Sequence, residues 1–206
     1  GGGVYQAEVK ADDFAYRLSL RPDGPPLLNG AAGFSRKGPD PRQASYYYSQ
    51  PQLAVSGAIV LNGRRMAIES STTDNGTNRA WLDHEWSDAL MHPDAVGWDW
   101  IGMNLHDGSA LTAFRLRRAD GSALWAGGSW RAPGQAARIF ATTEVQFTPL
   151  RWWRSPLGGT RYPVQQAIDC PAGRFTITAM LDDHFHRGKF HVINPVVLLI
   201  DVWRDH

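Results

Sequence analysis

The densest group of residues that could carry out acid–base chemistry is Trp-Leu-Asp-His-Glu-Trp at residues 81–86. Successive side chains of a strand point to opposite faces, so His84 and Trp86 are expected on one face and Asp83 and Glu85 on the other. A carboxyl group or an imidazole in an apolar, aromatic pocket acquires a pKa that suits proton transfer. The segment therefore predicts an acid–base site. A strand end whose acids reach solvent or pair with arginine fits the same spacing equally well.

Two tryptophans that follow this segment could extend it into a ligand pocket. Trp98 and Trp100 flank a single aspartate. If their strand neighbours the first one, His84, Trp86, Trp98 and Trp100 form one wall of a cavity, and indole faces stabilise cations. Cross-strand aromatic packing is the simpler interpretation of the same residues.

Two tyrosines, Tyr46 and Tyr48, lie beyond a proline-rich segment and share one face if their segment is extended. They are candidates for the mouth of a pocket, where a phenol can donate a hydrogen bond to the polar end of a ligand. The alternative is a strand with solvent-exposed tyrosine hydroxyls.

Three histidines near the end of the chain, His184, His186 and His191, resemble a metal cluster. Their neighbours Arg187 and Lys189 oppose a cation, and the spacing does not define a full ligand set. The sequence therefore predicts neither a metal nor another cofactor.

Turn signals divide the chain into short strands. Asn-Gly at 62–63 and Asp-Gly at 107–108 and 120–121 each separate two apolar runs, as tight hairpins require. Residues 22–41, with five prolines, are expected to form a long crossing loop, and the polar residues 70–78 a hairpin tip or insertion. The pattern indicates an all-β protein. The expected strands are 4–9, 15–20, 52–61, 65–69, 79–86, 97–104, 110–117, 124–130, 142–149, 162–168 and 174–181.

The composition excludes several classes of protein. The 206 residues include 21 Lys and Arg against 20 Asp and Glu, a net charge of +1, which argues against electrostatic nucleic-acid binding. The single cysteine, Cys170, excludes an intrachain disulfide and a zinc site that needs two thiolates. The chain has nine Trp, enough to line a pocket, although a well-filled core accounts for them too.

Several motifs together resemble the CrtC/AttH family of lipocalin-like proteins, which includes carotenoid 1,2-hydratase. They are Gly-Phe-Ser-Arg-Lys-Gly at 33–38, Ala-Ser-Tyr-Tyr-Tyr-Ser-Gln-Pro at 44–51, Ala-Trp-Leu-Asp-His-Glu-Trp at 80–86, Gly-Trp-Asp-Trp at 97–100, Ser-Pro at 155–156 and Tyr-Pro at 162–163. Of these, the block at 80–86 is the specific one.

The resemblance implies a lipocalin-like antiparallel β-barrel, with part of a second lipocalin-like sheet at the N-terminus. Residues 1–50 are then the remnant of a first domain plus a crossing loop. Residues 51–206 form a second barrel domain, which departs from the family after residue 183. The bacterial periplasm or the membrane periphery is the location that the family suggests.

The resemblance also implies a function: addition of water to an alkene of a long isoprenoid, as in carotenoid 1,2-hydratase. His84, Asp83 and Glu85 are then the candidate catalytic residues. The expected partner is a small hydrophobic molecule, together with peripheral membrane contact and no nucleic acid. A non-catalytic carrier of a hydrophobic ligand and a pericyclase-like enzyme that folds a polyene are the alternatives. The candidate ligand-binding residues are Trp86, Trp98, Trp100, Tyr46 and Tyr48.

Overall fold

The computed structural model describes residues 3–69, 78–88, 91–179, 181–182 and 198–201. These residues form β-strands and contain no helix, so none of them forms a helix able to cross a bilayer. The strands are β1 (Tyr5–Lys10), β2 (Phe14–Arg21), β3 (Leu27–Leu28), β4 (Phe34–Arg36), β5 (Ala44–Leu61), β6 (Arg64–Ile68), β7 (Arg79–Trp86), β8 (Gly97–Asn104), β9 (Ala110–Arg117), β10 (Ala123–Arg131), β11 (Arg138–Phe140), β12 (Gln146–Arg154), β13 (Arg161–Cys170), β14 (Gly173–Thr178) and β15 (Leu198–Asp201).

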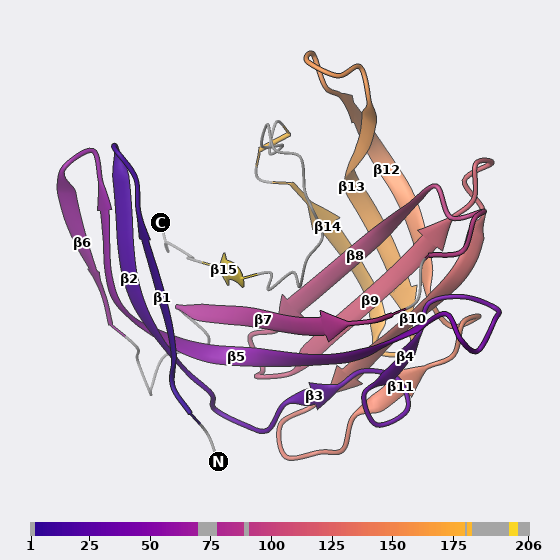
Figure 1. Cartoon of the computed structure of the whole chain (residues 1–206), viewed down its shortest axis with the longest axis horizontal. Helices are drawn as coiled ribbons and strands as arrows, with labels where there is room; N and C mark the ends of the chain where they lie inside the picture. The colour runs from indigo at the N-terminus through magenta and orange to yellow at the C-terminus, as the bar shows by residue number, and fades with distance from the viewer. Residues whose placement is uncertain (1–2, 70–77, 89–90, 180, 183–197, 202–206) are drawn as a thin grey trace.

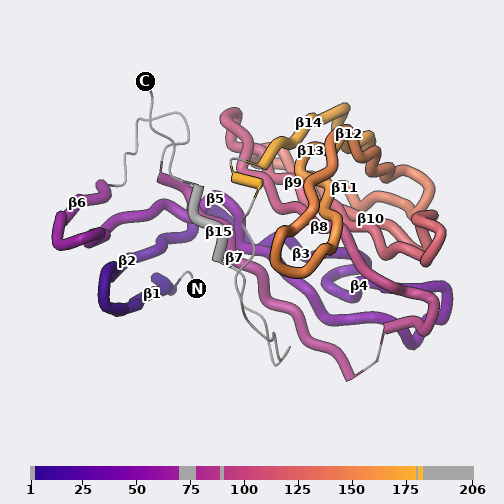
Figure 2. The backbone as a smooth tube through the Cα atoms, turned by 90° about the horizontal axis from the view of Figure 1, so that it is seen from above, coloured from indigo at the N-terminus to yellow at the C-terminus, as the bar shows by residue number. Residues whose placement is uncertain are grey.

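The strands form three antiparallel sheets (Figure 1). The first has the order β1-β2-β5-β7-β15, and β3, β4 and β6 also pair with β5. The second has the order β11-β10-β9-β8, and the third β12-β13-β14. Figure 2 shows β1, β2 and β6 at one end of the molecule and the second and third sheets at the other. The long strand β5 therefore runs from one end toward the other.

The hairpin rhythm predicted from the sequence is confirmed. Strands β7, β8 and β9 have the predicted bounds. The turn glycines Gly63, Gly108 and Gly121 have φ of 76°, 82° and 83°, the left-handed backbone that glycine adopts without steric cost.

Three sequence expectations differ from the structure. Strand β5 begins at Ala44 rather than at residue 52, and the supposed crossing loop 22–41 contains β3 and β4, which pair with β5. The predicted start of β5 was wrong because a proline such as Pro51 usually marks a strand boundary. Here Pro51 lies at a bulge, where the missing N–H is tolerated. The start of another strand is also displaced. Strand β12 begins at Gln146, four residues after the predicted start at residue 142.

The bulge in β5 reverses which residues face each side. Gln50 pairs with Leu82 and Leu53 pairs with Ala80, so β5 contains one residue more than β7 between these pairs. The extra residue is held in place at Gln52, whose φ is 55° and whose N–H donates to Asn104 Oδ1 at 2.8 Å. Tyr48 before the bulge and Leu53 and Val55 after it consequently share a face.

The core consists of separate clusters between and on the sheets. One cluster covers a face of the first sheet, a second lies between the second and third sheets, and a smaller one joins the first and second sheets through Leu27, Trp81 and Ala110. Gly102 permits this approach, because a Cβ there would come within 2.9 Å of the Trp81 and Trp100 rings.

The all-β, antiparallel class is thus confirmed, but the described strands form no closed barrel. The boundary expected after residue 50 falls inside β5. Division into two lipocalin-like domains stays a prediction.

Candidate functional site

Asp83 is the buried centre of a polar cluster between the first and second sheets. The alternation expected for residues 81–86 is confirmed: Trp81, Asp83 and Glu85 face the second sheet, and His84 and Trp86 lie on the other face of β7. Asp83 is only 5% exposed. A carboxyl group in such a place must be protonated or well hydrogen-bonded.

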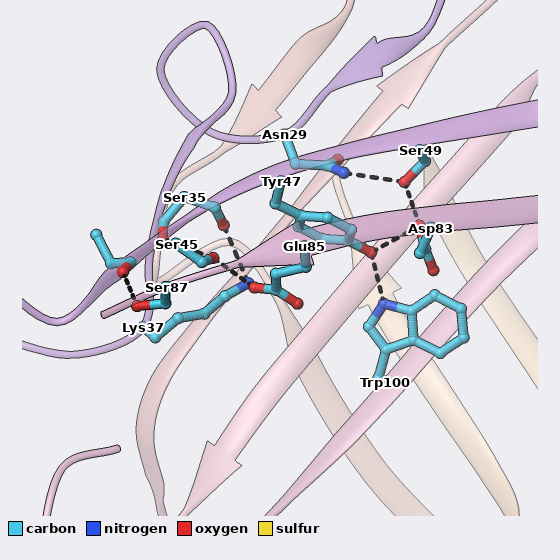
Figure 3. Close-up of polar contacts among 11 residues, drawn as sticks. Asn29, Ser35, Lys37, Ser45, Tyr47, Ser49, Asp83, Glu85, Ser87 and Trp100 are labelled. Atoms are coloured by element: carbon cyan, nitrogen blue, oxygen red, sulfur yellow. Dashed lines mark hydrogen bonds and ion pairs between the residues drawn. The ribbon is translucent and has the colours of Figure 1, made fainter. Parts of the chain in front are cut away.

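Three side chains donate hydrogen bonds to one oxygen of this carboxyl group, as Figure 3 shows in part. Asp83 Oδ1 accepts from Ser49 Oγ at 2.6 Å, from Trp81 Nε1 at 2.9 Å and from the Tyr47 hydroxyl at 3.0 Å. The Tyr47 hydroxyl in turn accepts from Trp100 Nε1 at 3.0 Å. Because all three bonds go to Oδ1, Oδ2 is the oxygen that can hold a proton.

Burial raises the pKa of Asp83 to about 6, and the charge of Glu85 acts in the same direction. The hydrogen bonds from Ser49, Trp81 and Tyr47 oppose this rise because they favour the ionised form. Burial and the nearby Asp83 carboxylate also raise the pKa of Tyr47, so its phenol stays protonated. Near neutral pH the cluster therefore holds an acid that can both give and take a proton.

Glu85 is occupied by a second group of contacts on the same face. Its Oε1 lies 2.9 Å from Lys37 Nζ and accepts a hydrogen bond from Ser45 (Figure 3). Lys37 Nζ also lies 4.7 Å from the centre of the Tyr47 ring and 4.2 Å from that of Phe114. Burial lowers the pKa of Lys37, whereas Glu85 raises it. In this arrangement Glu85 is the counter-ion of a lysine.

An aromatic row occupies the opposite face of β7 and β5. His84 stacks on Tyr48 with ring centres 5.3 Å apart and meets Trp86 edge-on at 5.0 Å. Tyr46 stacks on Trp86 at 5.5 Å. Tyr46 and Tyr48 therefore share a face as expected, but it is the face of His84, away from Asp83.

The expectation that His84, Trp86, Trp98 and Trp100 form one wall is wrong. Trp86 and Trp98 are 45% and 59% exposed, and Trp100 lies inside on the Tyr47 hydroxyl. The prediction assumed that β7 and β8 are neighbours in one sheet. They belong to different sheets that pack face to face, so their tryptophans point in different directions.

Hollows in the described part of the chain include one beside the Asp83 cluster and one away from it. A pocket of about 260 Å³ lies between β4–β5 and β9–β11, and Tyr47, Thr112 and Phe114 form part of its wall. A larger groove of about 480 Å³, lined mainly by β1, β2 and β5, contains none of the residues of the Asp83 cluster. Asp83 itself lines neither hollow, and its link to the pocket is Tyr47, whose hydroxyl donates to the Asp83 carboxyl group.

No group of His, Cys, Asp and Glu in the described part of the chain is arranged to hold a metal ion. The predicted histidine cluster at 184–191 lies outside the described residues.

Sequence reasoning missed the residues that surround Asp83: Tyr47, Ser49, Asn29 and Lys37. One signal was available for two of them. Ser45, Tyr47 and Ser49 place hydroxyl groups at every second position of one strand, which marks a polar face.

These features define a class: an all-β protein of packed antiparallel sheets with a buried, hydrogen-bonded acid between two of them. The AttH-like family matches residues 2–192, and the chain belongs to this family. The resemblance noted in the sequence is thereby confirmed.

Two solved structures have the same fold. An AttH-type protein of Nitrosomonas europaea is 42% identical, with a TM-score of 0.80 over 88% of this chain and 54% of that one. Kievitone hydratase of Nectria haematococca is 16% identical, with a TM-score of 0.70 over 87% of this chain and 53% of that one. The chain thus spans about half the length of each. The comparison with curated proteins gives no match.

Proposed function

We propose that this protein is hydratase-like and adds water across an alkene of an apolar substrate, with Asp83 as the proton donor. The observation that carries the proposal is the buried Asp83 carboxyl group, whose pKa of about 6 keeps part of it protonated near neutral pH. The AttH-like family and the fold shared with a hydratase support the same reaction class.

The reaction needs an acid, a site for a cation and a water molecule. Asp83 gives its proton to one alkene carbon, and the π electrons form the new C–H bond, which leaves a carbocation at the other carbon. Water attacks that carbon, and its released proton returns to the Asp83 carboxylate. We infer that two rings stabilise the positive charge: that of Tyr47, whose hydroxyl donates to Asp83, and that of Trp100, which donates to the same hydroxyl.

Substrate size follows from the pocket beside Tyr47. Its volume of about 260 Å³ is below the usual range of pockets that enclose a whole drug-sized ligand. We therefore propose that a long isoprenoid such as a carotenoid inserts only its terminal alkene. The rest of the isoprenoid then lies outside this pocket.

The aromatic row around His84 is the competing location for the reaction. If His84 is the acid, Trp86, Tyr46 and Tyr48 are the aromatic groups that hold the substrate. Because Asp83 and His84 lie on opposite faces of β7, single substitutions can separate the two locations.

The test is water incorporation from H₂¹⁸O into lycopene dispersed in detergent, followed by mass spectrometry of the products. We expect Asp83→Asn to lower turnover by a factor of 10² or more, within the ~10²–10⁴ typical of acid catalysis, whereas the exposed control Asp12→Asn keeps it. Loss in His84→Asn with full activity in Asp83→Asn would move the site to the aromatic row. Binding without ¹⁸O incorporation in the unsubstituted protein would favour a carrier and reject the proposal.

A further inference from the structure

The hairpin of β12 and β13 carries positive charge and no acidic residue. From residue 145 to residue 168 the chain has three arginines, Arg151, Arg154 and Arg161, and no Asp, Glu or Lys. Arg151 is paired with Asp182. Arg154 and Arg161 are both exposed and make no ion pair with any residue that the structure describes. The end of the hairpin therefore has two uncompensated charges.

These two arginines lie directly opposite each other. Arg154 pairs with Arg161 in the register of β12 with β13, so both side chains project from the same face. Like charges at such positions repel each other and destabilise a hairpin. The Arg161 guanidinium also lies 5.0 Å from the centre of the Trp152 ring, and a guanidinium that packs on an indole face can still donate in-plane hydrogen bonds to an oxyanion. An anion held by both arginines would relieve their repulsion.

The same hairpin exposes large apolar side chains. Leu150, Trp152 and Leu157 are 49%, 45% and 64% exposed. Leu157 lies in the turn at residues 155–160, which is closed by backbone hydrogen bonds of 2.9 Å. In Figure 1 this turn extends beyond the other labelled strands. The hairpin thus presents an apolar tip next to a pair of positive charges.

This combination fits the surface of an anionic bilayer. The lipid phosphates match the two arginines, tryptophan rings favour the interfacial region, and an exposed leucine is stabilised when it leaves water. A nucleic acid offers phosphates too, but it has no apolar region for Leu157. The net charge of +1 also gives the protein no general attraction to polyanions.

We propose that the end of the β12–β13 hairpin docks the protein on an anionic lipid surface. Arg154 and Arg161 bind lipid phosphate groups, while Trp152 and Leu157 enter the interfacial region of the bilayer. None of the side chains that donate to Asp83 belongs to this hairpin. The proposal therefore does not rest on the hydratase reaction.

The test is co-sedimentation of the full chain with lipid vesicles in the absence of substrate. One set of vesicles contains phosphatidylcholine alone, and the other contains one third phosphatidylglycerol. We expect tighter binding to the anionic set. Arg154→Gln combined with Arg161→Gln should weaken this binding about 25-fold, because each basic residue at an anionic surface contributes about fivefold. Leu157→Ser should weaken it about tenfold, because an apolar side chain no longer leaves water.

The matched control is Arg64→Gln combined with Arg65→Gln, which removes the same charge from the exposed start of β6, at the opposite end of the molecule (Figure 2). We expect this variant to bind the vesicles like the unsubstituted protein. The proposal is overturned if the anionic vesicles bind no more protein than the neutral ones, or if the two double variants lose binding equally. Retention of an oligonucleotide that depends on Arg154 and Arg161, without vesicle binding, would assign the hairpin to nucleic acid and reject the lipid surface.

Discussion

At the scale of single residues, the protein places an acid where ionisation is unfavourable. Asp83 receives three hydrogen bonds that favour its charge, yet burial outweighs them and its pKa rises to about 6. A surface carboxylate with the same donors would have a lowered pKa. Depth in the structure, and not the identity of its neighbours, therefore makes Asp83 a usable acid.

The raised pKa predicts how stability depends on pH. Between about pH 4 and 6 the folded protein keeps a proton on Asp83 that the unfolded chain releases, so the contribution of this residue to stability falls as the pH rises. A pKa that is higher by about 2 corresponds to about 3 kcal/mol in the free energy of unfolding. Asp83→Asn should remove this dependence. Urea unfolding of both proteins at pH 4 and pH 7 measures it.

In that experiment the variant should gain stability relative to the unsubstituted protein as the pH rises from 4 to 7. A difference between the two proteins that is the same at both pH values would contradict the raised pKa. Asp12→Asn, at an exposed position, serves as the control and should leave the pH profile unchanged.

At the scale of elements, β5 connects both ends of the molecule and must bend without losing its pairing. Before its bulge it pairs with β4 and β7, and after it with β2 and β6. Strand β2 runs close to its second half at Gly57, whose φ is 136° and where a Cβ would collide with the carbonyl oxygen of Arg17. The glycine is required by this approach of two backbones.

Gly57→Ala is therefore expected to destabilise the protein by about 3 kcal/mol, from backbone strain and a steric clash. The matched control is Gly63→Ala, because Gly63 also has positive φ, 76°, but has open space around its Cα. That variant should cost only about 1 kcal/mol. Thermal unfolding of the two variants compares them. Equal losses would show that the approach of β2 to β5 does not constrain residue 57.

At the scale of the whole molecule, the second sheet lies between the other two and must contact both. Toward the first sheet it presents Trp100 and Gly102. Toward the third it presents Arg115, which is bound to Asp99 at 2.6 Å and donates to the carbonyl oxygen of Phe147 at 3.0 Å. Arg115 thus connects β8 and β9 with β12.

Arg115→Leu should destabilise the protein by about 2 kcal/mol or more, because it leaves the buried Asp99 with only its partly exposed partner Arg117. Urea unfolding measures the loss, and the double variant with Asp99→Leu should recover part of it. Arg17→Gln breaks an exposed ion pair with Glu8 and should change nothing measurable. Arg115→Leu behaving like Arg17→Gln would rule out a structural role for the buried pair.

The amino-acid sequence by itself determined the local structure. Hairpin glycines and alternating residues predict β7, β8 and β9 to the residue, and they place Asp83 and Glu85 opposite His84 and Trp86. Periodicity suffices for this because strand formation and side-chain alternation depend on near neighbours in the chain. The family motifs also follow from residue order alone.

Only the tertiary structure decided which face of β7 is enclosed and which groups meet there. Asn29, Tyr47 and Asp83 come together through pairings between distant segments and through the packing of one sheet on another. Local alternation has two equivalent faces, and neither turn signals nor strand propensity distinguishes them. The burial that sets the pKa of Asp83 is a property of the assembled sheets, which is why it could not be read from residues 81–86.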